Sequence, residues 1–414
     1  MKTLAHCDLV VIGGGPAGMM CAYQAAAGGH SVIMLDGNRQ LGRKLRITGK
    51  GRCNLTNNCT VRDFMQNIPG DGRFLYSALN RFSPADVMAF FEDHGVPLKT
   101  ERGARVFPCS DRADDIADCM VHLCESVGVS TVRTRADSVL LTDGAVSAVH
   151  TPEGTISCRA AALCTGGLSY PLTGSDGAGY RMACAIGHTL TPTRPSLVPL
   201  ESDDAFCRDL QGFSLKNVTL RVYEDDKLIF RELGEMLFTH FGVSGPLVLS
   251  ASAHMRQVSS CTYRLEIDLK PGLDEEKLDA RILRDFAAQP NKTLANLMPG
   301  LTGRSMAPVV LSLAGVDGSI PVNTVTHAQR AAIRQVLKAF PVSVSGTRSV
   351  DEAIVTAGGI STKEVNPRTM ESKIVPGLYF AGEILDVDAY TGGFNLQIAW
   401  ATGYTAGTAV CDNL

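Results

Sequence analysis

The 414-residue sequence lacks any apolar stretch of about 18 residues that is free of glycine, proline and charge, so no transmembrane helix is expected. It also has little net charge, with 39 Lys and Arg against 42 Asp and Glu. This balance predicts no attraction of the whole protein to nucleic acid or to an anionic membrane. Its first residues hold one lysine and then an apolar run that a strand requires, which is not the pattern of a signal peptide. We therefore expect a cytoplasmic protein.

A Cys-x-x-Cys pair is also missing, although the chain holds 13 cysteines. Cys119 and Cys124 lie five residues apart in an expected helix, where such positions do not face each other. Cys53 and Cys59 are six apart, with polar residues between them. These spacings favour free thiols in a reducing compartment over a redox disulfide. The nine histidines are scattered and none is paired at helical spacing with another ligand, so no metal site is predicted.

The most informative segment that is present is an apolar run, 8–12, that leads into a Gly-x-Gly-x-x-Gly turn. A helix of small residues and a second apolar run follow, and that run ends at Asp36. This order of strand, turn, helix, strand and acid is typical of the unit that binds an ADP moiety. Gly13 allows the tight turn, Gly15 lets the backbone approach a pyrophosphate, and Gly18 lets the helix pack on the strand. Because Asp36 is spaced to hold a ribose 2′-hydroxyl, NAD and FAD both fit here and NADP fits poorly.

Later segments point to the longer of these cofactors. An apolar strand over 376–381 leads to Glu383, and in FAD proteins such a strand end places a carboxylate on the ribityl hydroxyls. A Gly-Gly pair within residues 391–397 then opens a helix whose N-terminus can face the electron-rich N1/C2=O edge of a flavin. A third strand, 161–164, ends in Thr-Gly-Gly, which lets backbone approach a cofactor. The alternative, in which the C-terminal strand and helix only complete the sheet, stays open.

The pattern along the chain predicts an α/β protein with an inserted region. Short alternating strands dominate from about 197 to 270, helical spacing dominates from 273 to 340, and strand–glycine–helix character returns near 350. We expect the two ends to close into one domain because one FAD is long enough to touch both. The expected domains are an FAD-binding domain (1–194 and 345–414), a β-rich insert (195–272 and 318–344) and a small helical domain (273–317).

Six segments together resemble a known family, the YhiN/BaiN-type flavoproteins. The segments are 42–57 (Gly-Arg-Lys-Leu-Arg-Ile-Thr-Gly-Lys-Gly-Arg-Cys-Asn-Leu-Thr-Asn), 236–246, 356–360, 371–373, 382–386 and 392–397. The match runs along the whole sequence, and its departures are small. Thr48 stands where serine is usual, Lys50 where a second glycine is common, and Cys164 where alanine is usual.

The resemblance implies a glutathione-reductase-like two-dinucleotide-binding FAD domain, split by a β-barrel-like insert and a small helical domain. The implied FAD-binding residues are Gly13, Gly15, Pro16, Ala17, Gly18, Asp36, Arg43, Lys44, Arg52, Cys53, Asn54, Thr165, Gly166, Gly167, Gly382, Glu383, Gly392, Gly393, Phe394 and Asn395. Three of them, Arg43, Lys44 and Arg52, carry charge that can neutralise a pyrophosphate. Arg46 and Lys50 fit that role and a solvated surface equally well.

Members of this family are linked to three reactions. They are reduction of conjugated C=C bonds in bile-acid-like 3-oxo steroids, reduction of uridine to dihydrouridine in ribosomal RNA, and oxidation of aminoacetone by oxygen. The first, on a small molecule, is favoured here. A flavin-binding module without activity is the remaining class. The basic loop 39–52 and a patch of Arg102, Arg105 and Arg112 keep the RNA alternative open.

The sequence also gives expectations about the electron donor and the proton donor of the reaction. The chain has no second Gly-x-Gly-x-x-Gly turn, so NADH or NADPH is expected to dock transiently at the flavin rather than on a domain of its own. His240 and Tyr390 are the candidate catalytic acids that would protonate the substrate carbon. Each also has a structural interpretation: Tyr390 packs on the cofactor, or His240 is hydrogen-bonded within the insert.

Overall fold

The computed structural model describes residues 3–256, 258 and 260–414, which fall into two compact units. Unit 1 consists of residues Met1–Ser196 and Val350–Leu414, and unit 2 of residues Leu197–Ser349. Each unit buries a hydrophobic core of its own. The chain therefore leaves unit 1, forms unit 2, and returns to complete unit 1.

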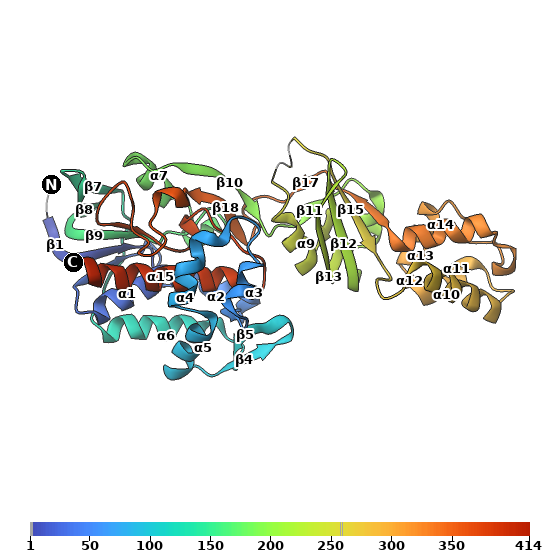
Figure 1. The fold of residues 1–414 in the computed structure, drawn as a ribbon, viewed down its shortest axis with the longest axis horizontal. Helices are drawn as coiled ribbons and strands as arrows, with labels where there is room; N and C mark the ends of the chain where they lie inside the picture. The colour runs from blue at the N-terminus through green and yellow to red at the C-terminus, as the bar shows by residue number, and fades with distance from the viewer. Residues whose placement is uncertain (1–2, 257, 259) are drawn as a thin grey trace. The chain divides into compact units, whose positions relative to one another are not determined.

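A seven-stranded sheet forms the centre of unit 1 (Figure 1). Its strands are β1 (Thr3–Ile12), β2 (Val32–Leu35), β6 (Ser130–Val132), β7 (Ser138–Thr142), β8 (Ala145–Thr151), β9 (Gly154–Leu163) and β19 (Leu378–Phe380). The order is β6-β2-β1-β9-β8-β7, and β19 pairs with β9. The β1–β2, β1–β9, β2–β6 and β9–β19 pairs are parallel, and the pairs of β8 are antiparallel. The end of β1 is buried without interruption, as expected for a parallel strand that is covered on both faces.

Two helices that are distant in sequence pack against each other in unit 1, α1 (Pro16–Ala27) and α15 (Phe394–Asn413). Their backbones come close because glycines of α15 face α1: a Cβ on Gly403 would lie 2.4 Å from the carbonyl oxygen of Ala17. Trp400 of α15 is fully buried, and its indole N–H donates to the carbonyl of Leu55 at 3.1 Å. The last helix is thus tied both to the first helix and to the chain segment 52–55.

The remaining elements of unit 1 surround the sheet. They are α2 (Arg43–Gly51), α3 (Val61–Met65), α4 (Tyr76–Arg81), α5 (Pro84–Asp93), α6 (Ala113–Ser126), α7 (Ala178–Ala185), the pair β10 (Leu190–Ser196) with β18 (Val355–Ile360), and a small sheet of β3 (Thr56–Asn57), β5 (Arg105–Pro108) and β4 (Leu98–Glu101). All 13 cysteines of the chain are free thiols.

Unit 2 combines an antiparallel sheet with a group of helices. The sheet order is β16 (Phe340–Ser343), β15 (Tyr263–Asp268), β12 (Ser214–Glu224), β13 (Lys227–Thr239), β14 (Gly242–Ser244), β11 (Leu200–Glu201) and β17 (Gly346–Thr347). The helices are α8 (Ala205–Asp209), α9 (Pro246–Ser252), α10 (Glu275–Ala288), α11 (Leu294–Leu297), α12 (Pro299–Thr302), α13 (Met306–Leu313) and α14 (His327–Lys338). Because α14 packs on α10 and α13, the helical group extends beyond residue 317.

A largely buried ion pair joins the sheet of unit 2 to its helical group. Lys338 ends α14, and its Nζ lies 2.6 Å from Oδ2 of Asp268, which ends β15. The two side chains are only 17% and 6% exposed. The same ammonium donates to the carbonyls of Leu273 (2.7 Å) and Lys270 (3.2 Å). All three ammonium protons therefore have acceptors, which is the condition under which a buried charge is tolerated.

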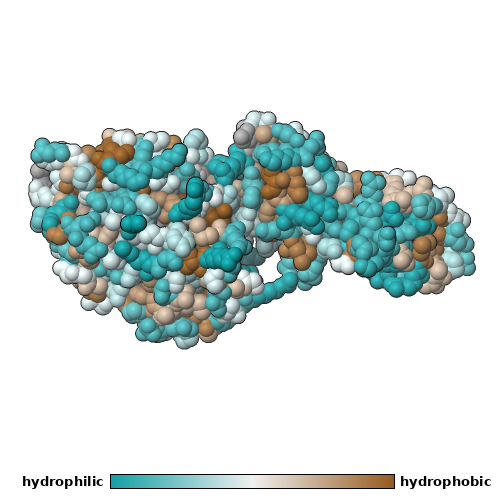
Figure 2. Space-filling model, viewed as in Figure 1, coloured by the Kyte–Doolittle hydropathy of each residue, from teal (hydrophilic) through white to brown (hydrophobic). Residues whose placement is uncertain are grey.

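The visible surface mixes polar and apolar residues, with apolar patches that are broken by hydrophilic side chains (Figure 2). Single large apolar side chains are exposed, including Leu172 at 83%, Leu233 at 64% and Tyr76 at 60%. None of the helices in the described residues is both long and apolar enough to span a membrane.

Candidate functional site

The glycine-rich turn between β1 and α1 divides its tasks among three glycines. Gly13 has φ +107, and a Cβ there would lie 2.5 Å from the carbonyl oxygen of Cys164. A Cβ on Gly18 would lie 1.8 Å from the carbonyl oxygen of Gly13. A Cβ on Gly15, by contrast, would meet no atom within 4 Å. Gly13 and Gly18 are thus required by the fold itself, and only Gly15 faces open space.

Pro16 and Ala17 begin α1 directly after this turn. Ala17 faces the C-terminal segment: a Cβ added to Gly382 would lie 2.8 Å from the Cβ of Ala17. The side chain of Ala17 is therefore part of the internal packing. What α1 offers a ligand is its first-turn N–H groups, which have no partner within the helix.

Asp36, which follows β2, is held by three donors. Its Oδ2 accepts from the backbone N–H of Gly14 at 2.8 Å. Its Oδ1 accepts from the backbone N–H of Asn38 at 2.7 Å and from the Nδ2 of Asn38 at 2.9 Å. A carboxylate has about four acceptor positions, so the donors of the described residues leave one position, on Oδ2.

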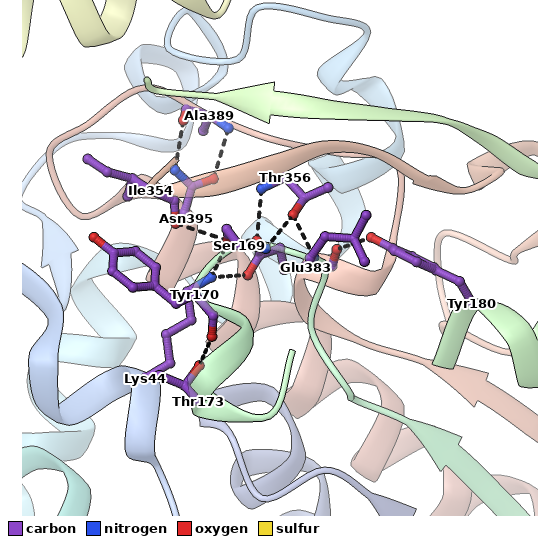
Figure 3. A network of polar contacts seen from close by, with 11 residues as sticks. Lys44, Ser169, Tyr170, Thr173, Tyr180, Ile354, Thr356, Glu383, Ala389 and Asn395 are labelled. Atoms are coloured by element: carbon purple, nitrogen blue, oxygen red, sulfur yellow. Dashed lines mark hydrogen bonds and ion pairs between the residues drawn. The ribbon is translucent and has the colours of Figure 1, made fainter. Parts of the chain in front are cut away.

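A second carboxylate is held in the same way where β18, the loop after β9 and the C-terminal segment meet (Figure 3). Oε1 of Glu383 accepts from the hydroxyl of Ser169 at 2.8 Å and from the backbone N–H of Thr356 at 2.9 Å. Its Oε2 lies 2.7 Å from Nζ of Lys44, which also donates to Ser169 at 2.7 Å. The structure thus pairs Lys44 and Glu383 with each other, and again one acceptor position, on Oε2, is left by the described residues.

The Thr-Gly-Gly segment after β9 lies beside this network. The hydroxyl oxygen of Thr165 is buried and has no hydrogen-bond partner within the described residues. Gly166 has φ +72, which glycine adopts readily. A Cβ on Gly167 would lie 2.5 Å from Oγ1 of Thr356, so this glycine allows the close approach of two chain segments.

The predicted cofactor residues at the start of α15 are largely turned toward the protein. Gly393, with φ +96, caps the helix. The side-chain oxygen of Asn54 accepts from the backbone N–H of Gly393 at 3.0 Å. Gly392 accepts at its carbonyl from the Nδ2 of Asn57 at 3.0 Å. Phe394 packs edge-on against Phe64, at 5.0 Å between ring centroids.

Asn395 turns back on the loop before the helix, where its side chain accepts from the N–H of Ala389 at 2.9 Å and donates to that residue's carbonyl at 2.7 Å. The side chains of Phe394 and Asn395 therefore shape the loop. A ligand at this helix would meet backbone N–H groups rather than these side chains.

The basic residues predicted to face a pyrophosphate separate in the structure. Arg52 is held by Asp111 at 2.9 Å and by Glu101, and its guanidinium lies 4.2 Å from the ring centroid of Phe107. These pairs remove the reason for assigning Arg52 to a phosphate, because the chain's own carboxylates neutralise it. Arg43 is exposed and is 3.4 Å from Oδ1 of Asn38.

Cys53 is fully buried with φ +57, and burial raises the pKa of its thiol to about 12. The thiol therefore stays protonated at neutral pH. Any contact of Cys53 with a cofactor would be through its backbone. Arg46, for which a surface role was equally expected, is paired with Asp114 at 2.7 Å and Asp118 at 2.6 Å.

The two candidate proton donors lie in different units. His240 belongs to unit 2, where it is exposed between β13 and β14 and packs against Phe241 at 5.0 Å between ring centroids. Tyr390 belongs to unit 1, in the loop before α15, and its backbone N–H donates to the carbonyl of Asn67 at 3.0 Å.

A buried Ser–His–Glu row elsewhere in unit 1 resembles a nucleophile arrangement but is a structural tie. The hydroxyl of Ser372 accepts from the N–H groups of Ile374 (2.9 Å) and Val375 (2.8 Å), so its proton is directed at Nε2 of His188, 3.0 Å away. Nδ1 of His188 is 3.3 Å from Glu364, and burial lowers the pKa of His188 and keeps it neutral. Because both lone pairs of Ser372 are occupied, the row fixes the segment that leads into β19.

The geometry fits an ADP-containing cofactor in two ways. The space beside Gly15 is open, and Asp36 and Glu383 each keep one acceptor position among the donors of the described residues. Sequence reasoning found these residues but missed Asn38, which holds one carboxylate. It also missed the partners of the other carboxylate, because they come from segments far apart in the chain.

Comparisons with known proteins agree with this geometry. A family model described as the HI0933-like protein Rossmann domain matches residues 7–409. A ribosomal RNA dihydrouridine synthase of Escherichia coli (strain K12) is 31% identical over 401 residues, which cover 96% of this chain and 96% of that protein. A 3-dehydro-bile acid delta(4,6)-reductase of Clostridium scindens is 30% identical over 415 residues, which cover 97% of this chain and 98% of that protein.

A solved structure supports the fold. A 3-ketosteroid-delta4-(5alpha)-dehydrogenase from Rhodococcus jostii RHA1, in complex with 4-androstene-3,17-dione, superposes with a TM-score of 0.56 at 16% identity. The match covers 99% of this chain and 98% of that chain. The predicted fold class, an α/β protein with a Rossmann-type FAD-binding domain, is confirmed.

Proposed function

This chain belongs to the HI0933-like family of FAD-dependent oxidoreductases, and from that membership we propose that it reduces an electron-poor C=C bond conjugated to a carbonyl group. The resemblance to YhiN/BaiN-type flavoproteins is confirmed by the same matches. The observation that carries the proposal is that the names of both relatives describe saturation of such a bond. One relative is a reductase of 3-dehydro-bile acids, and the other forms dihydrouridine, which differs from uridine by two hydrogens across the ring C=C bond.

The residues proposed to hold FAD follow from the open positions in unit 1. The pyrophosphate would lie against the backbone at Gly15 and the first turn of α1, with Asp36 on the adenosine ribose and Glu383 on the ribityl hydroxyls. The turn that Gly393 opens would direct backbone N–H groups of α15 at the flavin. Bound FAD supplies a hydride from its N5, and the protein must orient the acceptor and deliver a proton.

A small 3-oxo-steroid-like enone is the favoured substrate class. The bile-acid reductase relative supports this choice, and so does the formal net charge of −3, which gives no general attraction to RNA. Two arginines of the basic loop, Arg46 and Arg52, are already paired with carboxylates, which leaves less charge for a phosphate backbone. The free thiols of all 13 cysteines support a cytoplasmic location.

The direct test is anaerobic mixing of the flavin-loaded protein with NADH and, separately, NADPH, while flavin absorbance is followed. We expect rapid bleaching by one of the two, and recolouring when a 3-oxo-4-ene steroid is added. If the reduced flavin is reoxidised by uridine-containing ribosomal RNA and not by the steroid, the substrate is RNA. Absence of bleaching, with reduction by aminoacetone and peroxide formation instead, would contradict the reductase proposal.

Ribosomal RNA is the second candidate acceptor, because the dihydrouridine synthase relative is 31% identical. The residues proposed to face such an RNA are Arg102, Arg105 and Arg112, all of which are exposed. An RNA reductase is expected to bind its substrate with an affinity that falls steeply as salt rises. Binding that is weak and independent of salt would count against this candidate.

His240 gives a prediction of its own, because it is an exposed titratable residue in one of the segments that carry the family resemblance. If it is the catalytic acid, His240→Ala keeps bound FAD and its reduction by pyridine nucleotide but lowers product formation by about 100-fold or more. Stopped-flow reduction and product analysis separate the two half-reactions. Tyr390→Phe is the parallel variant, and normal turnover by His240→Ala would remove this histidine from the mechanism.

A further inference from the structure

A short segment of unit 1, Ser169–Asp176, is tied to both carboxylates of the candidate site. At its start, the hydroxyl of the fully buried Ser169 donates to Oε1 of Glu383 and accepts from Nζ of Lys44 (Figure 3). The backbone N–H of Ser169 also donates to Oγ1 of Thr356 at 3.0 Å. This end of the segment is therefore held at the carboxylate that is proposed to bind the ribityl chain.

The other end is tied to Asp36 through one side chain. Nδ2 of Asn38 donates to Oδ1 of Asp36 and to the backbone carbonyl of Thr173, each at 2.9 Å. The contact is close: a Cβ on Gly174, which has φ +106, would lie 2.8 Å from this same nitrogen. Asn38 thus uses both amide protons to connect the segment to the carboxylate that is proposed to bind the adenosine ribose.

Between the two ties the backbone is strained. Tyr170 has φ 55 and ψ 58, a left-handed conformation that costs a bulky residue about 1–2 kcal/mol. The carbonyl of Tyr170 accepts from the N–H of Thr173 at 2.8 Å and from the hydroxyl of Thr173 at 2.7 Å. Nζ of Lys44 lies 5.7 Å from the ring centroid of Tyr170. Such strain persists only where the surroundings hold the residue in place, so the ties at both ends are needed to keep this conformation.

We propose that Asn38 is a positioning residue for the cofactor, which orients Asp36 and holds the Ser169–Asp176 segment so that bound FAD is released slowly. The inference rests on the proposed function, since it takes Asp36 and Glu383 as the residues at the two ends of one FAD. Without the Nδ2 bonds the carboxylate of Asp36 loses one of its three donors, and the strained segment loses its tie at Thr173. Both changes remove preorganisation that the folded protein otherwise supplies before FAD binds.

The test compares FAD release from the flavin-loaded protein and from Asn38→Ala after dilution into an excess of a flavin-binding trap. Loss of one or two hydrogen bonds predicts release about tenfold faster. Leu172→Ala is the matched control, because Leu172 lies in the same segment and is 83% exposed.

A second readout separates positioning from a general structural role. The shape of the flavin absorption band is expected to be unchanged by Asn38→Ala, and the melting temperature of the flavin-free protein is expected to fall by no more than about 5 °C, because only one or two hydrogen bonds are lost. Two results would overturn the inference. One is an FAD release rate of Asn38→Ala within about twofold of that of the unchanged protein, and the other is a loss of stability of the flavin-free protein large enough to account for the faster release of FAD. If the unchanged protein retains no FAD at all, the proposed function fails instead.

Discussion

Replacement of Gly15 by alanine is expected to give a folded protein whose affinity for FAD is roughly 10- to 100-fold lower. Gly15 has φ −82, which alanine adopts without strain, and its Cβ would meet no protein atom within 4 Å. The methyl group would enter only the space where a pyrophosphate approaches the backbone. The loss should therefore appear in FAD binding and not in stability, as measured by flavin titration and by thermal unfolding.

Gly18→Ala is the matched control from the same turn. Its Cβ would lie 1.8 Å from the carbonyl oxygen of Gly13, so α1 must move away from β1. We expect a loss of about 3 kcal/mol of unfolding free energy in unit 1, whether or not FAD is present. Trp400, the only tryptophan, is buried in unit 1, and its emission reports this transition. Equal retention of FAD by Gly15→Ala and the unchanged protein would contradict the assignment of the pyrophosphate to this turn.

The second large effect is expected in unit 2, where Lys338→Met should lower the free energy of unfolding by about 3 kcal/mol. The substitution keeps a long apolar side chain but leaves Asp268, 6% exposed, without the ammonium 2.6 Å away. The carbonyls of Lys270 and Leu273 lose a donor at the same time. Removal of the near partner is costly because the carboxylate of Asp268 stays out of water with only the more distant guanidinium of Arg221, 3.9 Å away, beside it.

Lys277→Met is the control for this prediction. Lys277 pairs with Asp274 at 2.6 Å, but the two side chains are 70% and 55% exposed, so we expect a change of about 0.5 kcal/mol or less. Denaturant unfolding followed by circular dichroism should show the lower stability of Lys338→Met. The unfolding transition of unit 1, followed by the emission of Trp400, should keep the same midpoint in denaturant. Equal stability of the two variants would show that the buried pair contributes no more than the exposed one.

The sequence was sufficient to predict the first strand, turn and helix, because the apolar runs and the spacing of the glycines are local signals. The close contact that requires glycine at position 13, with the carbonyl of Cys164, comes from a distant part of the chain. The sequence could not predict that Lys44 pairs with Glu383, since these residues are 339 positions apart. The same limit applies to Arg52, because its pairing with Asp111 and Glu101 could not be predicted from the family motif that contains it.

The missed helper residue, Asn38, had a weak local signal, since it stands two residues after the acid that closes the second strand. An Asx side chain often accepts from the backbone N–H two residues further on, as Asp36 does from the N–H of Asn38. The bond of Asn38 to Thr173 depends on the loop after β9 and carries no such signal. Local spacing therefore predicted the cofactor class, whereas the pairing of the charges required the fold.

The division of unit 1 between residues Met1–Ser196 and Val350–Leu414 also constrains the order of events during synthesis. Unit 2 is continuous in the chain, so it can fold while the ribosome is still adding later residues. The FAD-binding unit cannot be completed then, because β19 must still pair with β9 and α15 must still pack on α1. The N-terminal strands and α1 must therefore wait, with their apolar surfaces uncovered, until translation has passed residue 400.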